Sequence, residues 1–389
     1  MPTATTNQPI FVSLIPNLLG GKGHVYAYHC AVREALMQLG WTHQAAVAPD
    51  AILKTLPEGW TPALDGPNLE AIASPVAKAL NWWGIYRWSE QVANYLRGVV
   101  VQGRPVIVLL ERFIPSQLIG LWLALARIPT DHVAVWLLYR RDIHRMRIRR
   151  LYKLLNQLIA QQLSPDRLQL LSDSELQAKS LMGYFQMPVT VMPIPHTTIE
   201  GAQPGATTPK HDIICWWVGE PRPEKGLATI QRLVTLTESV AEQFCLIHAA
   251  SANIASIPNG MKVKAIADNL SREDYNAWLM ASDIILLPYD CNAYQERTSG
   301  VFVEGVIAGK LPIVTQNTWM AHELARYGLS ELAVVWEQPG ILQYIVDRLH
   351  DPTVTDRLQR MQQAYLDFHT PATYAKVLLT LYHRSFPSS

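Results

Sequence analysis

The sequence predicts an α/β protein with two domains, each built on a parallel sheet that helices cover on both faces. The chain has 389 residues, more than one ordinary hydrophobic core needs, so two cores of about 150 to 200 residues each are expected. Short apolar runs alternate with helical patterns, which is typical of strands buried on both faces. Residues 201–210, GAQPGATTPK, interrupt this alternation near the middle of the chain and predict a linker.

Five apolar runs before the linker predict strands. They are short and rich in β-branched residues, and helical patterns separate most of them. The runs are IFVSLI from Ile10, VIVLL from Val106, VAVWLLY from Val133, LQLL from Leu168 and VTVMPI from Val189. We therefore predict an N-terminal domain over residues 1–200.

The same alternation restarts after the linker. The runs are IICWWVG from Ile213, FCLIHAA from Phe244, VKAIA from Val263, IILLPY from Ile284 and PIVT from Pro312. We predict a C-terminal domain over 211–365 and expect the last helix, in 366–389, to pack back on the N-terminal domain. Ligands of open parallel sheets bind outside the carboxyl ends of the strands, so two facing domains predict a deep cleft lined by strand-to-helix loops.

The composition favours a globular protein and argues against several other classes. The chain is 49% hydrophobic and 17% charged, and its net charge of +1 provides no electrostatic reason to bind nucleic acid. The most apolar stretch, 118–126, is too short to span a membrane, and we predict a cytoplasmic protein. The cysteines show no zinc or disulfide pattern: Cys30, Cys215, Cys245 and Cys291.

The segment 284–310 predicts a strand, a loop and a helix that together suit a diphosphate. Ser299 is a plausible helix N-cap and Gly309 a C-terminal stop. Thr298 and Gly300 then lie with Ser299 at the N-terminus of the helix, where free backbone N–H groups and the helix dipole attract anions. We expect the phosphates of a ligand at this point.

Two glutamates flank this helix start. Glu296 lies on the loop, and Glu304 lies about one turn into the helix, where it can accept hydrogen bonds from ribose hydroxyls. Their E-x7-E spacing resembles that of retaining GT-B glycosyltransferases of the group 1 type. The resemblance implies that Glu296 contacts the transferred sugar, that the backbone of residues 298–301, ending at Val301, contacts sugar and phosphate, and that Glu304 contacts the ribose. The alternative for Glu304 is a solvated helix residue.

The segment WWVGEPRPEKGLATI, residues 216–230, resembles the strand, glycine turn and helix start that open the donor domain of the same family. The resemblance implies that Gly219 forms the turn and that Lys225 neutralises the diphosphate. Family members usually carry an arginine directly after the glycine, where this chain has Glu220. Arg222 either substitutes for that arginine or is a solvated turn residue. The segment LSREDYNAWLMASDIILLPY from Leu270 extends the resemblance in the same order.

The first strand is followed by a glycine-rich loop that contains Gly20, Gly21, Lys22 and His24. It matches neither a dinucleotide fingerprint nor a Walker loop. It resembles the glycine loop that reaches the cleft in GT-B enzymes, which implies that Lys22 or His24 meets the diphosphate or the acceptor. The alternative is an ordinary glycine turn.

Residues 139–163 carry six arginines and Lys153, with apolar residues at helical spacing, and predict a basic amphipathic helix. Its basic face either contacts anionic lipid headgroups or a phosphorylated acceptor, or it is simply solvated. Arg140 and Arg141 directly follow a predicted strand, so we expect them on the acceptor side of the cleft. His196, just before the linker, either faces the cleft or is a structural histidine.

Together these features predict a hexosyltransferase-type glycosyltransferase that moves a sugar from a nucleotide-diphosphate sugar to an acceptor hydroxyl. The resemblance implies retention of anomeric configuration. No D-x-D pair stands at a strand end and no histidine cluster has ligand spacing, so we expect neither a metal nor a cofactor. The acceptor remains open among a glycan, a lipid and a small molecule. The alternatives are a GT-B-like sugar-nucleotide epimerase or phosphorylase, and a non-catalytic nucleotide-sugar-binding protein.

Overall fold

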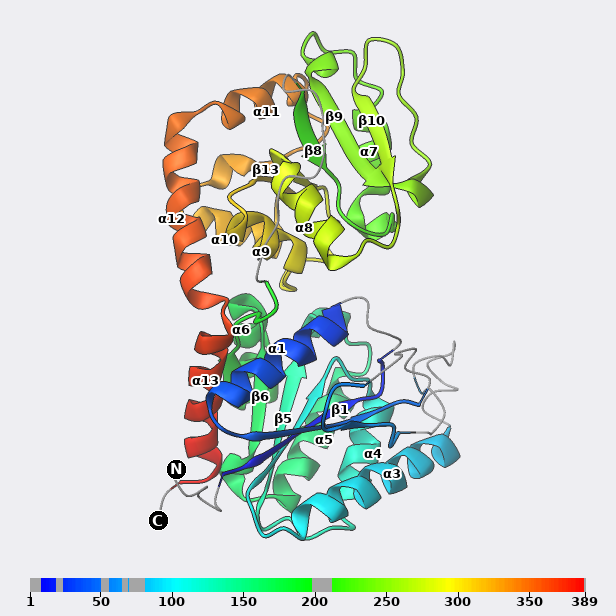
Figure 1. Ribbon diagram of the computed structural model, residues 1–389, viewed down its shortest axis with the longest axis vertical. Coiled ribbons are helices and arrows are strands. Elements are labelled where there is room, and N and C mark those ends of the chain that lie inside the picture. Colours follow the sequence, from blue (N-terminus) through cyan, green and yellow to red (C-terminus); the bar gives the residue numbers. More distant parts are fainter. Residues whose placement is uncertain are drawn as a thin grey trace. The chain divides into compact units, whose positions relative to one another are not determined.

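The computed structural model describes residues 8–18, 24–49, 56–64, 69, 81–197 and 212–387, and the structural statements below concern these residues. The chain divides into two compact units (Figure 1). The first unit comprises Met1–His196 and Thr370–Ser389, and the second comprises Thr197–His369. The C-terminal helix α13 (Pro371–Ser385) thus belongs to the first unit. The linker predicted at 201–210 lies outside the described residues.

The first unit contains a seven-stranded parallel sheet in the order β3-β2-β1-β4-β5-β6-β7. The strand order reverses at β1, which pairs with β2 on one side and β4 on the other. The strands are β1 (Ile10–Ile15), β2 (Thr42–Val47), β3 (Trp60–Thr61), β4 (Val106–Glu111), β5 (Val133–Tyr139), β6 (Leu168–Ser172) and β7 (Val189–Val191). All five predicted strands are present, and β2 and β3 were not predicted.

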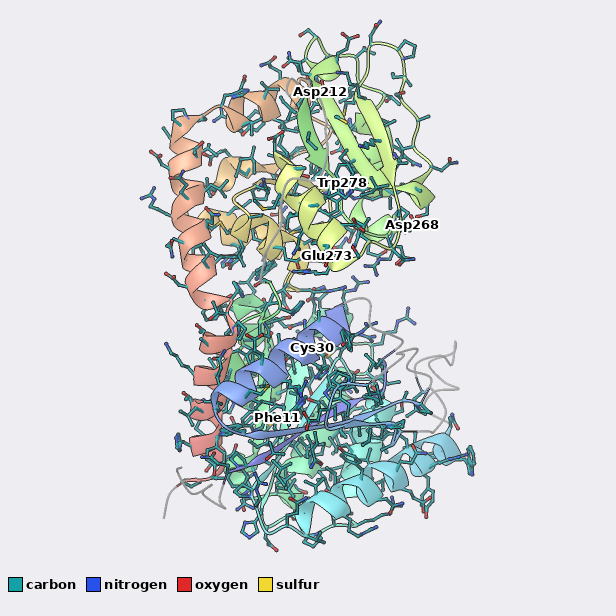
Figure 2. The ribbon with its side chains drawn as sticks, viewed as in Figure 1. Phe11, Cys30, Asp212, Asp268, Glu273 and Trp278 are labelled. Carbon is teal, nitrogen blue, oxygen red and sulfur yellow. The ribbon has the colours of Figure 1, made fainter. Side chains whose placement is uncertain are left out.

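Helices cover both faces of this sheet. They are α1 (His24–Gln38), α3 (Trp82–Val100), α4 (Pro115–Leu125), α5 (Arg149–Gln162), α6 (Glu175–Phe185) and α13. Because side chains alternate along a strand, Val12 packs with residues of α3, α4 and α5, whereas Phe11 (Figure 2) packs with residues of α1 and α13. A hydrogen bond of 2.6 Å between the hydroxyls of Tyr28 and Tyr374 joins α1 to α13.

The second unit contains a six-stranded parallel sheet in the order β10-β9-β8-β11-β12-β13. Its strands are β8 (Ile213–Trp216), β9 (Phe244–Ala249), β10 (Lys262–Ile266), β11 (Ile284–Leu287), β12 (Leu311–Thr315) and β13 (Ala333–Val334). Its helices are α7 (Leu227–Leu233), α8 (Arg272–Ala281), α9 (Gly300–Ile307), α10 (Trp319–Arg326), α11 (Ile341–Leu349) and α12 (Pro352–Phe368). The order reverses at β8, so the predicted fold class, α/β with two Rossmann-like domains, is confirmed.

The prediction of one basic helix over 139–163 is wrong in its first part. Tyr139 ends β5, a 3₁₀ turn follows at Ile143–Arg145, and α5 begins only at Arg149. Ile143 and Met146 are buried in the core beneath this turn, and the extended backbone at Met146 separates the turn from the helix. Core packing therefore overrides the helical spacing.

Among the described helices, none is long and apolar enough to cross a bilayer.

Candidate functional site

Two loops of the second unit meet where the strand order reverses. One follows β8 and the other follows β11, and these two strands are parallel neighbours. The Asp290 N–H donates to the Glu224 carbonyl at 3.0 Å, which joins the loops. Gly226 has a positive φ of 83°, and a Cβ there would collide with the carbonyl of Pro288. The close approach of the loops therefore requires glycine at this position. The carboxyl edge at such a reversal is where open sheets bind ligands.

Lys225 extends over the glycine turn that follows β8. Gly219 has a φ of 87°, and a Cβ placed on it would lie 2.8 Å from the Lys225 Nζ. The ammonium donates to the carbonyl of Val218 at 3.4 Å, and the indole of Trp217 donates to the Lys225 carbonyl at 3.0 Å. The backbone and the side chain of this lysine are both held by its own loop.

Lys225 lies in a cluster with two arginines, one from each loop. Burial, together with the nearby positive charges of Arg222 and Arg297, lowers the pKa of Lys225 to about 8. The Lys225 Nζ lies 5.9 Å from the ring centroid of Tyr289, and the Arg297 guanidinium lies 5.0 Å from that of Tyr294. The two tyrosine rings are 4.4 Å apart. We call Lys225, Arg222 and Arg297 the cation cluster, and a bound anion would relieve the repulsion among them.

Arg222 is half-buried and paired with two acids of its own loop. Its guanidinium lies 3.8 Å from Glu220 and 3.3 Å from Glu224. Its substitution for the family arginine and the solvated-turn alternative both stay predictions. Its charge is partly compensated, yet it still acts on Lys225 and on Tyr289.

The helix start predicted beside this cluster is confirmed. Ser299 caps α9, because its hydroxyl accepts from the Phe302 N–H at 3.3 Å, and Gly309 follows the end of the helix. Gly300, the first residue of the helix, is exposed, and a Cβ placed on it would meet open space. Ser299 also hydrogen-bonds the hydroxyl of Tyr289, which connects the helix start to the cation cluster. Glu296, Thr298 and Val301 are half-buried around it.

Glu304 is buried and engaged, so the alternative of a solvated helix residue is excluded. One carboxylate oxygen accepts from the Arg272 guanidinium at 2.8 Å, and the other accepts from the Tyr275 hydroxyl at 2.6 Å. Both partners lie on α8. Burial raises the pKa of Tyr275, and the negative charge of Glu304 raises it further, so the tyrosine stays protonated and donates. The ribose-binding role of Glu304 stays a prediction.

The loops after β9 and β10 also lie at this carboxyl edge. Asp268 (Figure 2), just after β10, accepts from the backbone N–H of Ser251 at 2.9 Å and from its hydroxyl at 2.6 Å. These hydrogen bonds lower the pKa of Asp268. The two loops are thereby tied together beside the turn at Gly219, since β9 is the neighbour of β8.

The carboxyl ends of β4, β5 and β6 in the first unit hold a buried charge network. The Arg140 guanidinium pairs with Glu111 at 3.1 Å and with Asp173 at 2.8 Å. Burial disfavours the charge of Arg140, but the two carboxylates outweigh burial and raise its pKa. His29 Nε2 lies 3.5 Å from Glu111, and the ring of Tyr28 lies 4.8 Å beneath the guanidinium. We call Arg140, Glu111, Asp173 and His29 the buried network.

The other predicted acceptor-side residues are distributed around this network. Arg141 is exposed, and His196 is half-buried with its ring edge against Tyr28 at a centroid distance of 6.0 Å. His24 begins α1. Three positions of the predicted glycine loop lie outside the described residues: Gly20, Gly21 and Lys22. A small pocket lies at the ends of β4 and β5, and its lining residues are Arg112, Phe113, Tyr139, Arg140, Arg141, Met146 and Tyr152.

Sequence reasoning missed several of these residues. Arg297 lies between two predicted site residues, yet its approach to Lys225 depends on the pairing of β8 with β11. Glu111 and Arg112 end or follow β4, and Asp173 follows β6. A charged residue directly after a buried apolar run was the available signal. In the part of the chain that the structure describes, no cluster of three or more His, Cys, Asp or Glu side chains is arranged to hold a metal.

Comparisons with known proteins support the architecture. No protein-family model matches the sequence, and no curated protein matches it. The N-terminal domain of a trehalose-6-phosphate phosphatase from Candida albicans aligns with 98% of this chain and 97% of its own, at 12% identity and a TM-score of 0.65. A UDP-N-acetylglucosamine 2-epimerase aligns over 98% of both chains, at 13% identity and a TM-score of 0.55.

A third similar structure is an α-glucosyltransferase in complex with UDP-glucose and DNA containing an abasic site. It aligns over 97% of this chain and 100% of its own, at 10% identity and a TM-score of 0.56. At these identities the likeness establishes the fold. The chain has the two-domain GT-B fold of glycosyltransferases and sugar-nucleotide epimerases.

Proposed function

We propose that this protein is a glycosyltransferase that moves a sugar from a nucleotide-diphosphate sugar to an acceptor hydroxyl. The observation that carries the proposal is the cation cluster beside the open N-terminus of α9, at the reversal point of the second sheet. A diphosphate is the anion that such a group of cations and free N–H groups suits best. The UDP-glucose bound to the similar α-glucosyltransferase is a ligand of this class.

The leaving diphosphate gains negative charge as the bond to the sugar breaks. Lys225 and Arg297 are held near the helix N-terminus, so they stabilise that charge without having to reorganise. These cations serve where a divalent metal would otherwise be needed, and the reaction proceeds without metal or organic cofactor. The anomeric carbon exchanges its phosphate oxygen for the acceptor oxygen on the same face, with retention. A phosphate oxygen of the donor takes the acceptor proton.

The two glutamates bind the donor on either side of the phosphates. Glu296 contacts the transferred sugar. Glu304 contacts the ribose, and its hydrogen bonds to Arg272 and Tyr275 hold it in place for that contact. A carboxylate has about four lone-pair sites, so two remain for ribose hydroxyls.

A sugar-nucleotide epimerase is the second candidate, because one similar structure is a UDP-N-acetylglucosamine 2-epimerase. An epimerase would use the same phosphate site but would convert the nucleotide sugar without an acceptor. A phosphorylase would require inorganic phosphate, and a non-catalytic protein would return the donor unchanged. Product analysis with one donor separates all four outcomes.

The deciding experiment begins with a thermal-shift screen of UDP, GDP, ADP and TDP sugars, because ligands that bind the folded state raise its melting temperature. The donor that stabilises the protein is then incubated with pooled acceptors, and the products are analysed by mass spectrometry. We expect a glycosylated acceptor from the wild type and almost none from Glu296→Gln at unchanged melting temperature. A changed sugar without an acceptor product would replace transfer by epimerisation.

For residues 139–163 we infer peripheral contact with an anionic membrane surface. Seven basic residues fall between positions 140 and 153, where Asp142 is the only acid. Ile148 and Leu154 are exposed among them, at 47% and 49%. Exposed apolar side chains beside basic ones suit the headgroup boundary. In a flotation assay, the protein should rise through the gradient with phosphatidylglycerol vesicles. The double variant Arg147→Glu, Arg150→Glu should no longer bind these vesicles. Equal binding of the wild type to neutral vesicles would contradict the proposed electrostatic contact.

A further inference from the structure

The pocket at the carboxyl ends of β4 and β5 has a rigid aromatic floor. Phe113 and Tyr139 are buried edge to face at 4.8 Å, and the ring of Tyr152 lies 6.2 Å from each. The hydroxyl of Tyr139 donates to the Asn156 side chain at 2.9 Å, and that of Tyr152 donates to the Phe113 carbonyl at 3.4 Å. These partners fix the rings, so the floor is formed before any ligand arrives.

Arg112, at the rim of the pocket, has a backbone conformation that arginine rarely adopts. Its φ is +46°, in the left-handed region that favours glycine. Neighbouring groups hold the strained backbone, since the Arg112 N–H donates to the Leu138 carbonyl at 3.2 Å and Asn17 donates to the Arg112 carbonyl at 3.5 Å. Glycine would meet the backbone requirement without strain. The side chain, and not the backbone conformation, therefore accounts for an arginine at this position. Strained backbone conformations are common at ligand-binding sites.

The charges around the pocket are unequal. Arg140 is neutralised by Glu111 and Asp173. Among the described residues, no carboxylate forms an ion pair with Arg112 or with Arg141, and both side chains are exposed. The small pocket is thus lined by two arginines, Arg112 and Arg141, for which the described part of the chain supplies no carboxylate partner.

We propose that this pocket binds a phosphate ester carried by the acceptor, with Arg112 and Arg141 as its ligands. Planar guanidinium groups bind phosphate oxygens in pairs, and the phosphate then lies over the aromatic floor with the rest of the acceptor outside the pocket. The assignment of this phosphate to the acceptor rests on the proposed glycosyl transfer. The phosphate site itself does not, because it is defined by the first unit alone.

The test measures binding of glucose 6-phosphate by calorimetry, with glucose as the uncharged match. The wild type should bind the ester and not glucose. Arg112→Gly removes the charge and relieves the strain, so it should weaken binding about tenfold or more without lowering the melting temperature. Arg141→Gln should weaken binding similarly. Arg112→Lys keeps a charge, so its affinity should lie between those of the wild type and Arg112→Gly. The control Arg87→Gln, which changes an exposed arginine on α3, should bind the ester as the wild type does.

Lys225→Ala distinguishes this pocket from the donor site. If Lys225→Ala abolishes binding of the ester and Arg112→Gly does not, the ester occupies the donor site and the proposal is overturned. Phosphatidylcholine vesicles containing phosphatidic acid, in place of the ester, test a lipid-borne phosphate; binding lost in Arg112→Gly would assign the phosphate to a lipid headgroup. If neither probe binds in an Arg112-dependent way, the proposal fails. Arg112-dependent binding without any transfer product would leave the pocket standing and remove the transferase.

Discussion

Both sheets carry basic side chains at their carboxyl edge, but the partners of these side chains differ between the two units. In the first unit, Arg140 is half-buried between the buried carboxylates of Glu111 and Asp173, and each charge has a partner. In the second unit, Lys225 lies close to Arg222 and Arg297, and among the described residues no carboxylate forms an ion pair with it. The charges of the first arrangement are balanced without a ligand. In the second arrangement, a bound anion would reduce the repulsion among the cations.

This contrast separates a structural network from a binding site although both lie where open sheets bind ligands. The pKa values show the difference, because the carboxylates raise the pKa of Arg140, whereas burial and neighbouring cations lower that of Lys225. A perturbed pKa alone marks neither arrangement as functional. The direction of the shift, with the identity of the neighbours, distinguishes them.

The largest expected effect comes from breaking the buried network. Arg140→Met leaves two buried carboxylates without their partner and should lower the free energy of unfolding by about 3 to 5 kcal/mol. The matched change Lys225→Met removes a repelled cation and should leave that free energy unchanged or raise it. Urea denaturation of both variants measures the difference. Equal losses in the two would remove the distinction between network and site.

The second effect concerns binding. Lys225→Met should weaken nucleoside diphosphate binding by about 2 kcal/mol, about thirtyfold, because a charge-assisted contact to phosphate is lost. Calorimetry with the diphosphate identified by the thermal-shift screen measures this loss. Arg360→Gln, on the exposed side of α12, is the control and should bind normally. Undiminished affinity in Lys225→Met would contradict the phosphate assignment.

A third, smaller effect is a pH dependence set by the same lysine. Free Lys225 loses its proton as the pH rises through its pKa of about 8, and a bound diphosphate favours the protonated form. Affinity should therefore hold below that pKa and fall above it, by no more in total than the loss expected for Lys225→Met. Lys225→Arg stays charged and should flatten the profile. A wild-type profile that is flat to pH 10 would show that the ammonium does not contact the ligand.

Much of the fold was predictable, because continuous apolar runs mark strands buried on both faces, and all ten predicted runs form strands. The strands that were missed lack this signal. In β2, THQAAV, the first three residues are polar and only half-buried, while β3 and β13 each have two residues. The single helix over 139–163 failed because burial of Ile143 and Met146 outweighed the periodicity.

The candidate site was predictable only where its signal is local. Ser299 was identified because capping involves residues three apart, and Gly309 because glycine ends helices. Arg297 and the backbone strain at Arg112 have no local signal, since each depends on groups brought in by neighbouring strands. Spatial proximity across a sheet is the information that one sequence lacks.

The smallest expected effect tests where the diphosphate lies. A Cβ on Gly300 meets open space, so Gly300→Ala should leave the free energy of unfolding unchanged or raise it by about 0.5 kcal/mol. The same methyl group would occupy the side from which a phosphate approaches the helix N-terminus, so donor affinity should fall about threefold. Calorimetry resolves this change, and Gly183→Ala on α6, also in open space, controls for the substitution itself. If Gly300→Ala binds the donor as tightly as the wild type, the phosphates are held by the cation cluster without the helix, and only the side chains of Lys225 and the two arginines define the site.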